Sequence, residues 1–319
     1  MLIYQMAVVF ALVLLWPVQS QSQEIPFISD GGGGKTVFSI EHQSDSAPSS
    51  NPELFIEEQK ASLAIPLYNN QKGSTLSFLL RGSRTLVGED LTFPDRDIEV
   101  PREFGTAETG FSWLSKSIDG DSLGFSATYG FAGRRLLDSG LTPIIAATLT
   151  LEKQSTDSRS WLFFLNYSNN RVLLNHVPIP GIAYLIKEKT RFFAIGVPFF
   201  FGMWQSDPVY FTLATSPLFV SGEASYRFWG PLLLSANAKW NPKSYQNLVE
   251  GSEERLIFDR KEVALNLKAF FGKYGNLSFG YAWNFNRRFL LGRSILDKDA
   301  NSLSLDDSDG LRFSARLNF

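Results

Sequence analysis

The chain has 319 residues, of which 44% are hydrophobic and 14% aromatic, and its formal net charge is −2. So much apolar sequence excludes an intrinsically disordered protein. The balance of 30 basic against 32 acidic residues excludes a nucleic-acid-binding protein that works through a basic surface. Because the sequence contains no cysteine, it has no disulfide framework, no thiolate metal site and no acylated N-terminal cysteine of a lipoprotein.

The N-terminus is predicted to be an export signal. The apolar run at 7–16 is shorter than the roughly 20 residues that a membrane-spanning helix needs. Val18 and Ser20 occupy the −3 and −1 positions of a cut after residue 20, which is typical of a signal peptidase site. We therefore expect residues 1–20 to be a cleaved signal peptide, with an uncleaved anchor as the alternative. Residues 21–34 end in consecutive glycines and are expected to form a flexible lead.

From residue 35 onward, apolar and polar side chains alternate with a period of two, which predicts strands whose two faces meet different surroundings. The mean hydropathy of −0.06 fits such interleaving. It is too polar for a bundle of membrane helices. The alternation predicts about 14 strands, with about 12 as the alternative. The expected spans are 35–43, 53–67, 72–84, 103–117, 121–133, 144–154, 159–171, 178–187, 190–201, 209–228, 231–243, 259–272, 275–289 and 309–319.

The connections between these segments alternate between short turns and longer loops. This is typical of an antiparallel up-and-down barrel that crosses a membrane, with both termini at the short-turn end when the strand number is even. About 14 strands enclose too wide a cylinder for side chains to fill, so the apolar face is expected to contact lipid and the polar face the lumen. We thus predict an all-β fold, an antiparallel up-and-down transmembrane β-barrel over residues 35–319.

The polar face of the predicted strands carries charges of both signs. Mixed signs suggest ion pairs that narrow the lumen, whereas a ring of one sign would select ions by charge. These pairs either tune the permeation of a small solute or neutralise one another and fill the barrel. The side chains expected to line the lumen are Arg81, Glu108, Glu223, Arg227, Lys239, Glu262, Lys268, Arg312 and Arg316.

Prolines interrupt two neighbouring segments of the expected wall. Pro180 with Gly181, and Pro198 further on, are expected to kink the wall because proline cannot donate a hydrogen bond to the strand ladder. A bend in the wall is the simpler interpretation. A lateral opening for an apolar solute is the alternative.

The last ten residues, GLRFSARLNF, carry apolar side chains at alternate positions and end in Phe319. This segment resembles the C-terminal strand of bacterial outer-membrane barrels, which the barrel-assembly machinery reads. The resemblance implies an assembly signal at Phe313, Leu317 and Phe319, export to the bacterial cell outer membrane, and contact with membrane lipid and lipopolysaccharide. The segments NYSNNRVLLNHVPIPGIAYLI and RFFAIGVPFFFGMW resemble an uncharacterised family of outer-membrane proteins, similar to barrels found near aromatic-compound degradation.

No motif in the sequence indicates a catalytic group, a metal site or a cofactor-binding site. His176 has Asn175 and Ser168 nearby, but nothing marks that serine as a nucleophile. His42 has no ligand spacing to His176, and the acidic residues at 297–309 read as a solvated charge run. The leading hypothesis is a non-enzymatic, passive channel or facilitator for a small solute. The alternatives are a structural or adhesive barrel acting through loops 85–102, 244–258 and 290–308, and, less favoured, an outer-membrane hydrolase.

Overall fold

The computed structural model describes residues 35–46, 54–70, 73–94, 96–133, 142–245 and 254–319. The expected signal peptide (1–20) and the expected lead (21–34) lie outside the described residues. Within the described part of the chain, no helix has the length and apolar character needed to cross a lipid bilayer.

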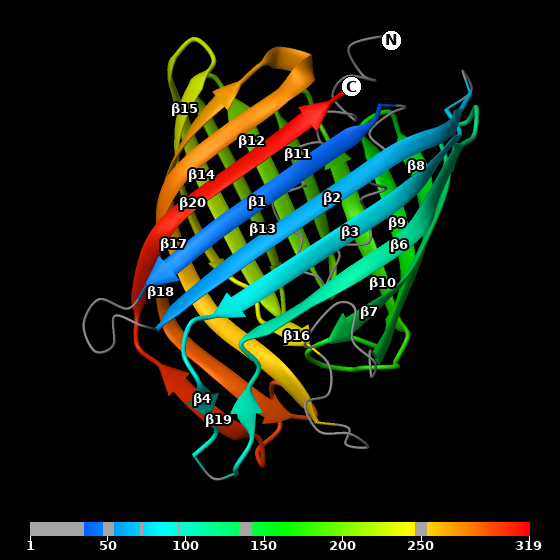
Figure 1. Cartoon of the computed structure of the whole chain (residues 1–319). Helices are drawn as coiled ribbons and strands as arrows, with labels where there is room; N and C mark the ends of the chain where they lie inside the picture. Colours follow the sequence, from blue (N-terminus) through cyan, green and yellow to red (C-terminus); the bar gives the residue numbers. More distant parts are fainter. Residues whose placement is uncertain (1–34, 47–53, 71–72, 95, 134–141, 246–253) are drawn as a thin grey trace.

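Antiparallel strands make up nearly all of the described chain (Figure 1). The strands are β1 (Val37–Ser46), β2 (Phe55–Asn69), β3 (Thr75–Val87), β4 (Leu91–Thr92), β5 (Glu99–Val100), β6 (Glu103–Lys116), β7 (Ser122–Gly133), β8 (Thr142–Thr156), β9 (Arg159–Ser168), β10 (Ile179–Lys187), β11 (Arg191–Val197), β12 (Phe200–Ser206), β13 (Val209–Ser216), β14 (Phe219–Trp229), β15 (Leu232–Trp240), β16 (Lys243–Tyr245), β17 (Arg255–Phe270), β18 (Gly275–Gly292), β19 (Asn301–Leu305) and β20 (Ser308–Asn318). A short 3-10 helix, η2 (Gly272–Tyr274), lies in the turn before β18.

The sheet closes on itself through the first and last strands. Val37 of β1 pairs with Ala64 of β2 on one side and with Asn318 of β20 on the other. The barrel contains 16 strands, because β15 with β16, and β19 with β20, each act as one interrupted strand against their neighbour. Closure leaves no strand edge unpaired, which is what a lipid environment requires of a β-structure.

The expectation of about 14 strands, or about 12, is wrong, because two tight hairpins escaped detection. The expected strand 190–201 and the loop after it are in fact β11 and β12, and the expected strand 209–228 is β13 and β14. A proline sits at each missed turn. Pro198 lies between β11 and β12, so it starts a hairpin rather than kinking a strand, whereas Pro180 and Gly181 lie inside β10, opposite Leu165 and Phe164 of β9.

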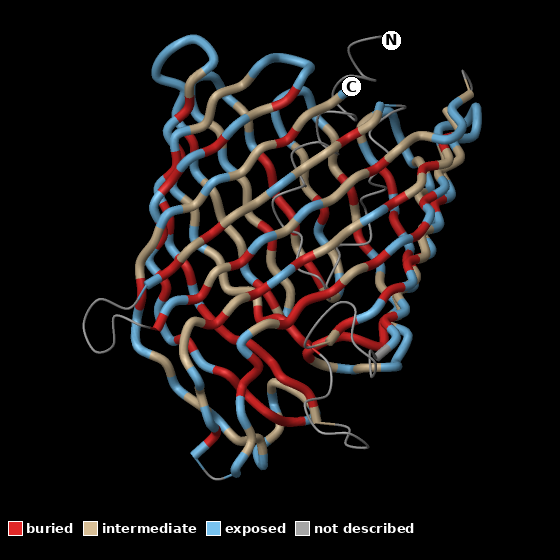
Figure 2. The backbone as a smooth tube through the Cα atoms, in the orientation of Figure 1, coloured by how far each residue is buried: buried red, intermediate tan, exposed pale blue. Residues whose placement is uncertain are grey.

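The two faces of the sheet point as the alternation predicts. Phe279, Trp283 and Phe313 lie on the outer face with 55%, 41% and 39% of their surface exposed. Between them along the same strands, polar side chains such as Ser278 and Arg316 point inward and are buried. Exposed and buried positions therefore alternate along most of the wall (Figure 2). An outer surface of exposed Phe, Leu, Trp and Tyr is the surface that a bilayer accommodates.

The two ends of the barrel differ. The first and last described residues of the barrel lie at the end with the short turns, where Phe319 exchanges backbone hydrogen bonds with Thr36. At the opposite end the wall is uneven in height. There β17 and β18 run for 16 and 18 residues, while β11 and β12 have only 7 each. The tall hairpin consequently extends further at the loop end of the barrel than β11 and β12 do.

Candidate functional site: a charged lumen with a closed mouth

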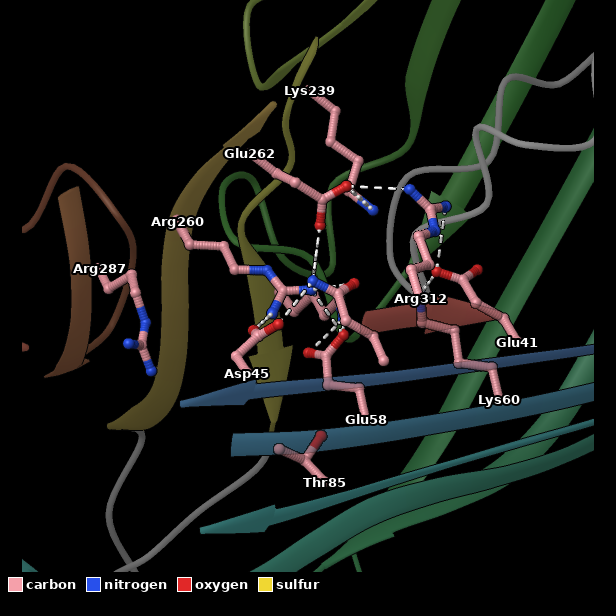
Figure 3. Close-up of polar contacts among 12 residues, drawn as sticks. Glu41, Asp45, Glu58, Lys60, Thr85, Lys239, Arg260, Glu262, Arg287 and Arg312 are labelled. Atoms are coloured by element: carbon pink, nitrogen blue, oxygen red, sulfur yellow. Dashed lines mark hydrogen bonds and ion pairs between the residues drawn. The ribbon is translucent and has the colours of Figure 1, made fainter. Parts of the chain in front are cut away.

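A set of charged and amide side chains occupies part of the lumen just inside the loop end (Figure 3). We call this set the lumen network. It comes from strands that adjoin one another around the closure of the sheet, and each side chain occupies an inward-facing position. Its members are Glu41, Gln43 and Asp45 of β1, Glu58 and Lys60 of β2, Lys239 of β15, Lys243 of β16, Arg260 and Glu262 of β17, and Arg312 of β20.

Arg260 is the centre of the half of the lumen network that lies nearer the loop end. Its guanidinium nitrogens lie 3.1 Å from Asp45 Oδ2, 2.8 Å from Glu58 Oε2 and 3.8 Å from Glu262 Oε2. Lys243 Nζ donates to both carboxylate oxygens of Glu58 at 2.6 Å. One arginine and one lysine thus compensate acidic groups from three different strands.

Glu262 and Arg312 link this cluster to the other half of the network, which lies nearer the short-turn end. Glu262 accepts from Lys239 at 2.9 Å and from Arg312 at 3.0 Å. Arg312 also lies 3.3 Å from Glu41, which lies 3.4 Å from Lys60. The side chain of Glu262 has no exposed surface, and a buried carboxylate is tolerated only when it is paired in this way.

The barrel brings these charges together because successive inward positions lie two residues apart. Glu41, Gln43 and Asp45 therefore form one ladder on the inner face of β1. On β17, Arg260 and Glu262 are likewise two residues apart, and both point into the lumen while Lys261 between them is exposed. Holding many ion pairs in fixed geometry narrows and rigidifies the lumen, which is a role better supported for buried pairs than simple stabilisation.

The sequence-predicted lining residues fall into several places. Glu262, Lys239 and Arg312 belong to the lumen network. Nearer the short-turn end, Lys268 Nζ lies 2.6 Å from both oxygens of Glu223. Arg81 of β3 lies directly opposite Glu108 of β6, and Arg316 is buried on β20. Arg227 is the exception, because it lies half-exposed at the short-turn rim, 3.2 Å from Asp207.

The sequence analysis missed seven of the ten members of the lumen network, namely Glu41, Gln43, Asp45, Glu58, Lys60, Lys243 and Arg260. In β1 and β2 both faces carry polar residues near the loop end, so alternation gives no sign of which face turns inward. Lys243 belongs to β16, which was not expected as a separate element. Polar residues at every second position, as in the run Glu41, Gln43 and Asp45, were the available signal.

The inner wall on the other side of the barrel is apolar. Strands β9 to β14 turn a cluster of buried hydrophobic side chains inward, which we call the phenylalanine sector. On β10, Gly181 faces the ring of Phe164 so closely that a Cβ there would lie 1.9 Å from its Cζ. The sector consists of Leu162, Phe164, Ala183, Leu185, Ala194, Phe199, Phe201, Met203, Ala214 and Phe219, with Phe192 packed against it. In strand order it faces the charged side of the lumen, so the interior is amphipathic.

A hairpin and a strand cover part of the mouth at the loop end. Segment 88–102, with β4 and β5, places Phe93 and Val100 into a buried apolar cluster that includes Phe258 and Phe289 of the tall β17–β18 hairpin. From β16, the Tyr245 hydroxyl lies 3.3 Å from Thr85 Oγ1. The ring centroid of Tyr245 is 4.5 Å from that of Phe104. These contacts join strands that are not neighbours in the sheet.

Loop 169–178 approaches the same hairpin from the other side of the mouth. Arg255 of β17 donates to the Asn169 carbonyl at 2.8 Å, and the Ile295 N–H donates to the Val172 carbonyl at 2.9 Å. Val172 is fully buried with Ile257 and Leu290. Because β9, which precedes this loop, is remote from β17 in strand order, these contacts cross the mouth and cover part of it.

Loop 169–178 is itself organised by a buried arginine. Arg171 donates to the Val177 carbonyl at 2.8 Å and to the Asn166 carbonyl at 2.8 Å. Burial lowers the pKa of Arg171 to about 10, so its guanidinium remains charged at neutral pH. The loop is therefore a fixed part of the mouth, anchored at the end of β9.

The remaining residues considered for chemistry lie apart from one another. His42 is on the outer face of β1, with Nδ1 3.7 Å from a Glu57 oxygen. His176 is in loop 169–178 with a positive φ of 62°, and its N–H donates to the Ser168 carbonyl at 3.1 Å. In the part of the chain that the structure describes, no three His, Asp or Glu residues gather as metal ligands.

An outer apolar belt, a closed sheet and buried charged groups inside the barrel together decide the class of the molecule. The protein is a membrane-spanning β-barrel. No known family model matches its sequence, and no curated protein sequence matches it either.

Solved structures with a similar fold are bacterial outer-membrane barrels and channels. The TodX ΔS2S3 mutant, a monoaromatic hydrocarbon channel, matches with a TM-score of 0.42 and 9% identity over 89% of this chain and 90% of its own. The outer membrane protein OpdK of Pseudomonas aeruginosa matches at 0.39 and 11% identity, over 89% and 98%. An outer-membrane channel of Pseudomonas putida F1 matches at 0.36 and 10% identity, over 90% and 96%. This level of similarity is limited to the barrel architecture.

Proposed function

We propose that the protein is a channel or facilitator for small solutes in the bacterial outer membrane. The observation that carries this proposal is the amphipathic lumen, in which the lumen network faces the phenylalanine sector across a closed barrel. A barrel whose only task is structural needs no such division, since neutral side chains fill an interior equally well. A polar inner wall beside an apolar one instead provides contacts for both parts of an amphipathic solute.

The proposal treats the described conformation as the closed state of the channel. The contacts of Arg255 with Asn169 and of Ile295 with Val172 cross the mouth, and passage of a solute requires them to separate. Loop and hairpin contacts of this kind open on the microsecond-to-second timescale in other proteins. The proposal also includes export through the signal peptide at 1–20 and recognition of the final strand, with Phe319, by the barrel-assembly machinery.

Conductance of the refolded protein in a planar lipid bilayer tests the function. We expect brief, discrete openings from a silent baseline, because the mouth is closed at rest. A matched variant, Arg255→Ala, removes the guanidinium that holds Asn169, and we expect it to increase the fraction of time spent open severalfold. A barrel that inserts correctly and stays silent in both forms would contradict the proposed function.

The adhesive alternative depends on loops that face outward, and two observations weigh against it. The apolar side chains of 88–102 are packed inside the mouth, and Ile295 of the loop after β18 packs against Val172. Surface-binding assays with a variant that lacks residues 89–99 separate the two functions. Loss of binding to a surface with unchanged conductance would favour adhesion over transport.

A further inference from the structure

Three polar side chains on the inner face of β18 and β20 form a cluster apart from the ion pairs of the lumen network. Asn284 of β18 lies directly opposite Ser308 of β20. Arg287 lies three residues further along β18, toward the mouth. The exposed fractions of Asn284, Arg287 and Ser308 are 1%, 1% and 5%. We call these three residues the β18–β20 cluster.

An irregularity in β18 is what turns Arg287 inward. Phe285 pairs with Lys261 and Arg288 pairs with Asp259 on β17, so β18 has one extra residue between these two pairs. Asn286 absorbs it with a φ of 50°, in the left-handed region that Asn tolerates better than most residues. Without this bulge Arg287 would face outward, so the chain deviates from regular pairing in a way that delivers a guanidinium to the lumen.

The β18–β20 cluster has hydrogen-bonding atoms without partners among the described residues. Arg287 Nη1 donates to the Asp306 carbonyl at 2.9 Å, but its Nε and Nη2 have no acceptor. The amide nitrogen and oxygen of Asn284 and the hydroxyl of Ser308 are likewise unpartnered. A buried guanidinium with two idle N–H groups is strongly unfavourable, which points to a missing acceptor that carries negative charge.

The charges around Arg287 leave room for such an acceptor. The carboxylates that act on Arg287 are those of Asp45, Asp306 and Asp307. Asp45 is already engaged by Arg260 and by Gln43, and Asp307 accepts from the Asn286 N–H at 3.3 Å. Taken with Arg287 and the carboxylates that act on it, the lumen network holds six cations and six carboxylates, but none of these carboxylates accepts a hydrogen bond from Arg287 Nε or Nη2 in the described part of the chain; the cations are Lys60, Lys239, Lys243, Arg260, Arg287 and Arg312, and the carboxylates are Glu41, Asp45, Glu58, Glu262, Asp306 and Asp307.

We propose that the β18–β20 cluster binds the carboxylate group of a small organic anion. The parallel Nε–H and Nη2–H of a guanidinium match the two oxygens of a carboxylate, and Asn284 and Ser308 supply further N–H and O–H donors beside it. The inference rests on the proposed function, because the site is taken to be a binding site along the path of a solute through the lumen. A free inorganic phosphate offers similar oxyanion chemistry, and the experiment separates the two.

Equilibrium dialysis of the detergent-solubilised full chain against radiolabelled acetate measures binding without any need for conductance. We expect one acetate per chain. Arg287→Gln is expected to weaken binding about tenfold or more, since hydrogen bonds to charged groups are the stronger ones. Ser308→Ala is expected to weaken it about threefold, since it removes a single neutral donor. The matched control is Arg288→Gln, the next residue along, which pairs with Asp259 away from the lumen at 2.8 Å and should leave acetate binding unchanged.

The outcomes are distinguishable. Equal acetate binding by the wild-type chain and Arg287→Gln, or none by the wild type, overturns the proposal and leaves a site that holds water only. Displacement of acetate by equimolar inorganic phosphate identifies phosphate as the preferred oxyanion and overturns the carboxylate assignment. If Arg287→Gln does not fold, as judged by gel mobility before and after heating, Ser308→Ala still decides. Acetate binding with a silent bilayer refutes the proposed function while leaving the anion site intact.

Discussion

At the residue scale, the lumen network shows how a barrel keeps charged groups in its interior. Arg260 compensates Asp45, Glu58 and Glu262 at once, and Lys243 adds a second cation to Glu58. Removing one member leaves its partners as buried charges without a counter-charge, which is unfavourable. The network is therefore expected to be sensitive to single substitutions in a way that exposed ion pairs are not.

Glu58→Gln tests this sensitivity. The change leaves Lys243 and Arg260 short of a counter-charge, and we expect it to lower the free energy of unfolding by about 3 kcal/mol, the cost of breaking a buried pair. Urea unfolding of the protein in lipid vesicles provides the measurement. Glu103→Gln is the control, because Glu103 pairs with Arg84 at 2.8 Å where both side chains are well exposed. Equal stability of the two variants would show that the lumen solvates its charges freely.

Gly181 provides a second residue-scale prediction. A Cβ at this position would lie 1.9 Å from Phe164 Cζ, so Gly181→Ala must displace that ring from the phenylalanine sector. We expect a loss of about 1–3 kcal/mol, the usual cost of overpacking. In Gly222→Ala the new Cβ meets Leu213 at an ordinary 3.7 Å, and unfolding in urea should be unchanged. A stable Gly181→Ala variant would mean that the sector is loosely packed.

At the element scale, the tall β17–β18 hairpin is the part of the wall that closes the mouth. Its loop-end half is buried on one side by segment 88–102 and on the other by loop 169–178. Tight turns at β11–β12 and β13–β14 leave the opposite wall low, so the hairpin and loop 169–178 meet across the opening. Opening therefore requires a change in how these elements contact one another, while the strands of the wall stay paired.

A reversible cross-link tests this mechanism. The natural chain has no cysteine, so the double variant Val172→Cys with Ile295→Cys forms a defined disulfide between loop 169–178 and the loop after β18. We expect oxidation to abolish openings in the planar bilayer and reduction to restore them. The two single-cysteine variants should be indifferent to reductant. Unchanged openings in the oxidised double variant would place the gate elsewhere.

At the scale of the whole molecule, barrel closure decides which surface meets lipid. Adjacent residues on β13 offer a matched pair, since Phe211 is 42% exposed on the outer face and Thr212 faces inward opposite Glu223. We expect Phe211→Arg to destabilise the protein in vesicles by about 1 kcal/mol, less than at the centre of a bilayer, because Phe211 is only the third residue of β13 after the short turn. Thr212→Arg gains Glu223 as a partner and should fold normally. The reverse order would mean that the apolar face is not in contact with lipid.

Some of this architecture follows from local sequence and some does not. Alternation in segments such as Leu311 to Phe319 fixes which side chains share a face, because successive residues of any strand point in opposite directions. The placement of both termini at the short-turn end likewise follows from the order of short and long connections. The strand number does not, because Pro198 and Pro217 read equally well as interruptions of one strand or as turns between two.

The sequence by itself determined the membrane barrel, its outward apolar face and an inner face of mixed charge, since these depend on a periodicity of two that is present in each strand separately. Only the tertiary structure decided which charges meet, that Arg287 turns inward and that loop 169–178 contacts the β17–β18 hairpin across the mouth. Those features depend on the register of the closed sheet and on contacts between strands far apart in the chain. No local pattern specifies them, because one bulge, such as that at Asn286, reverses the facing of every residue after it.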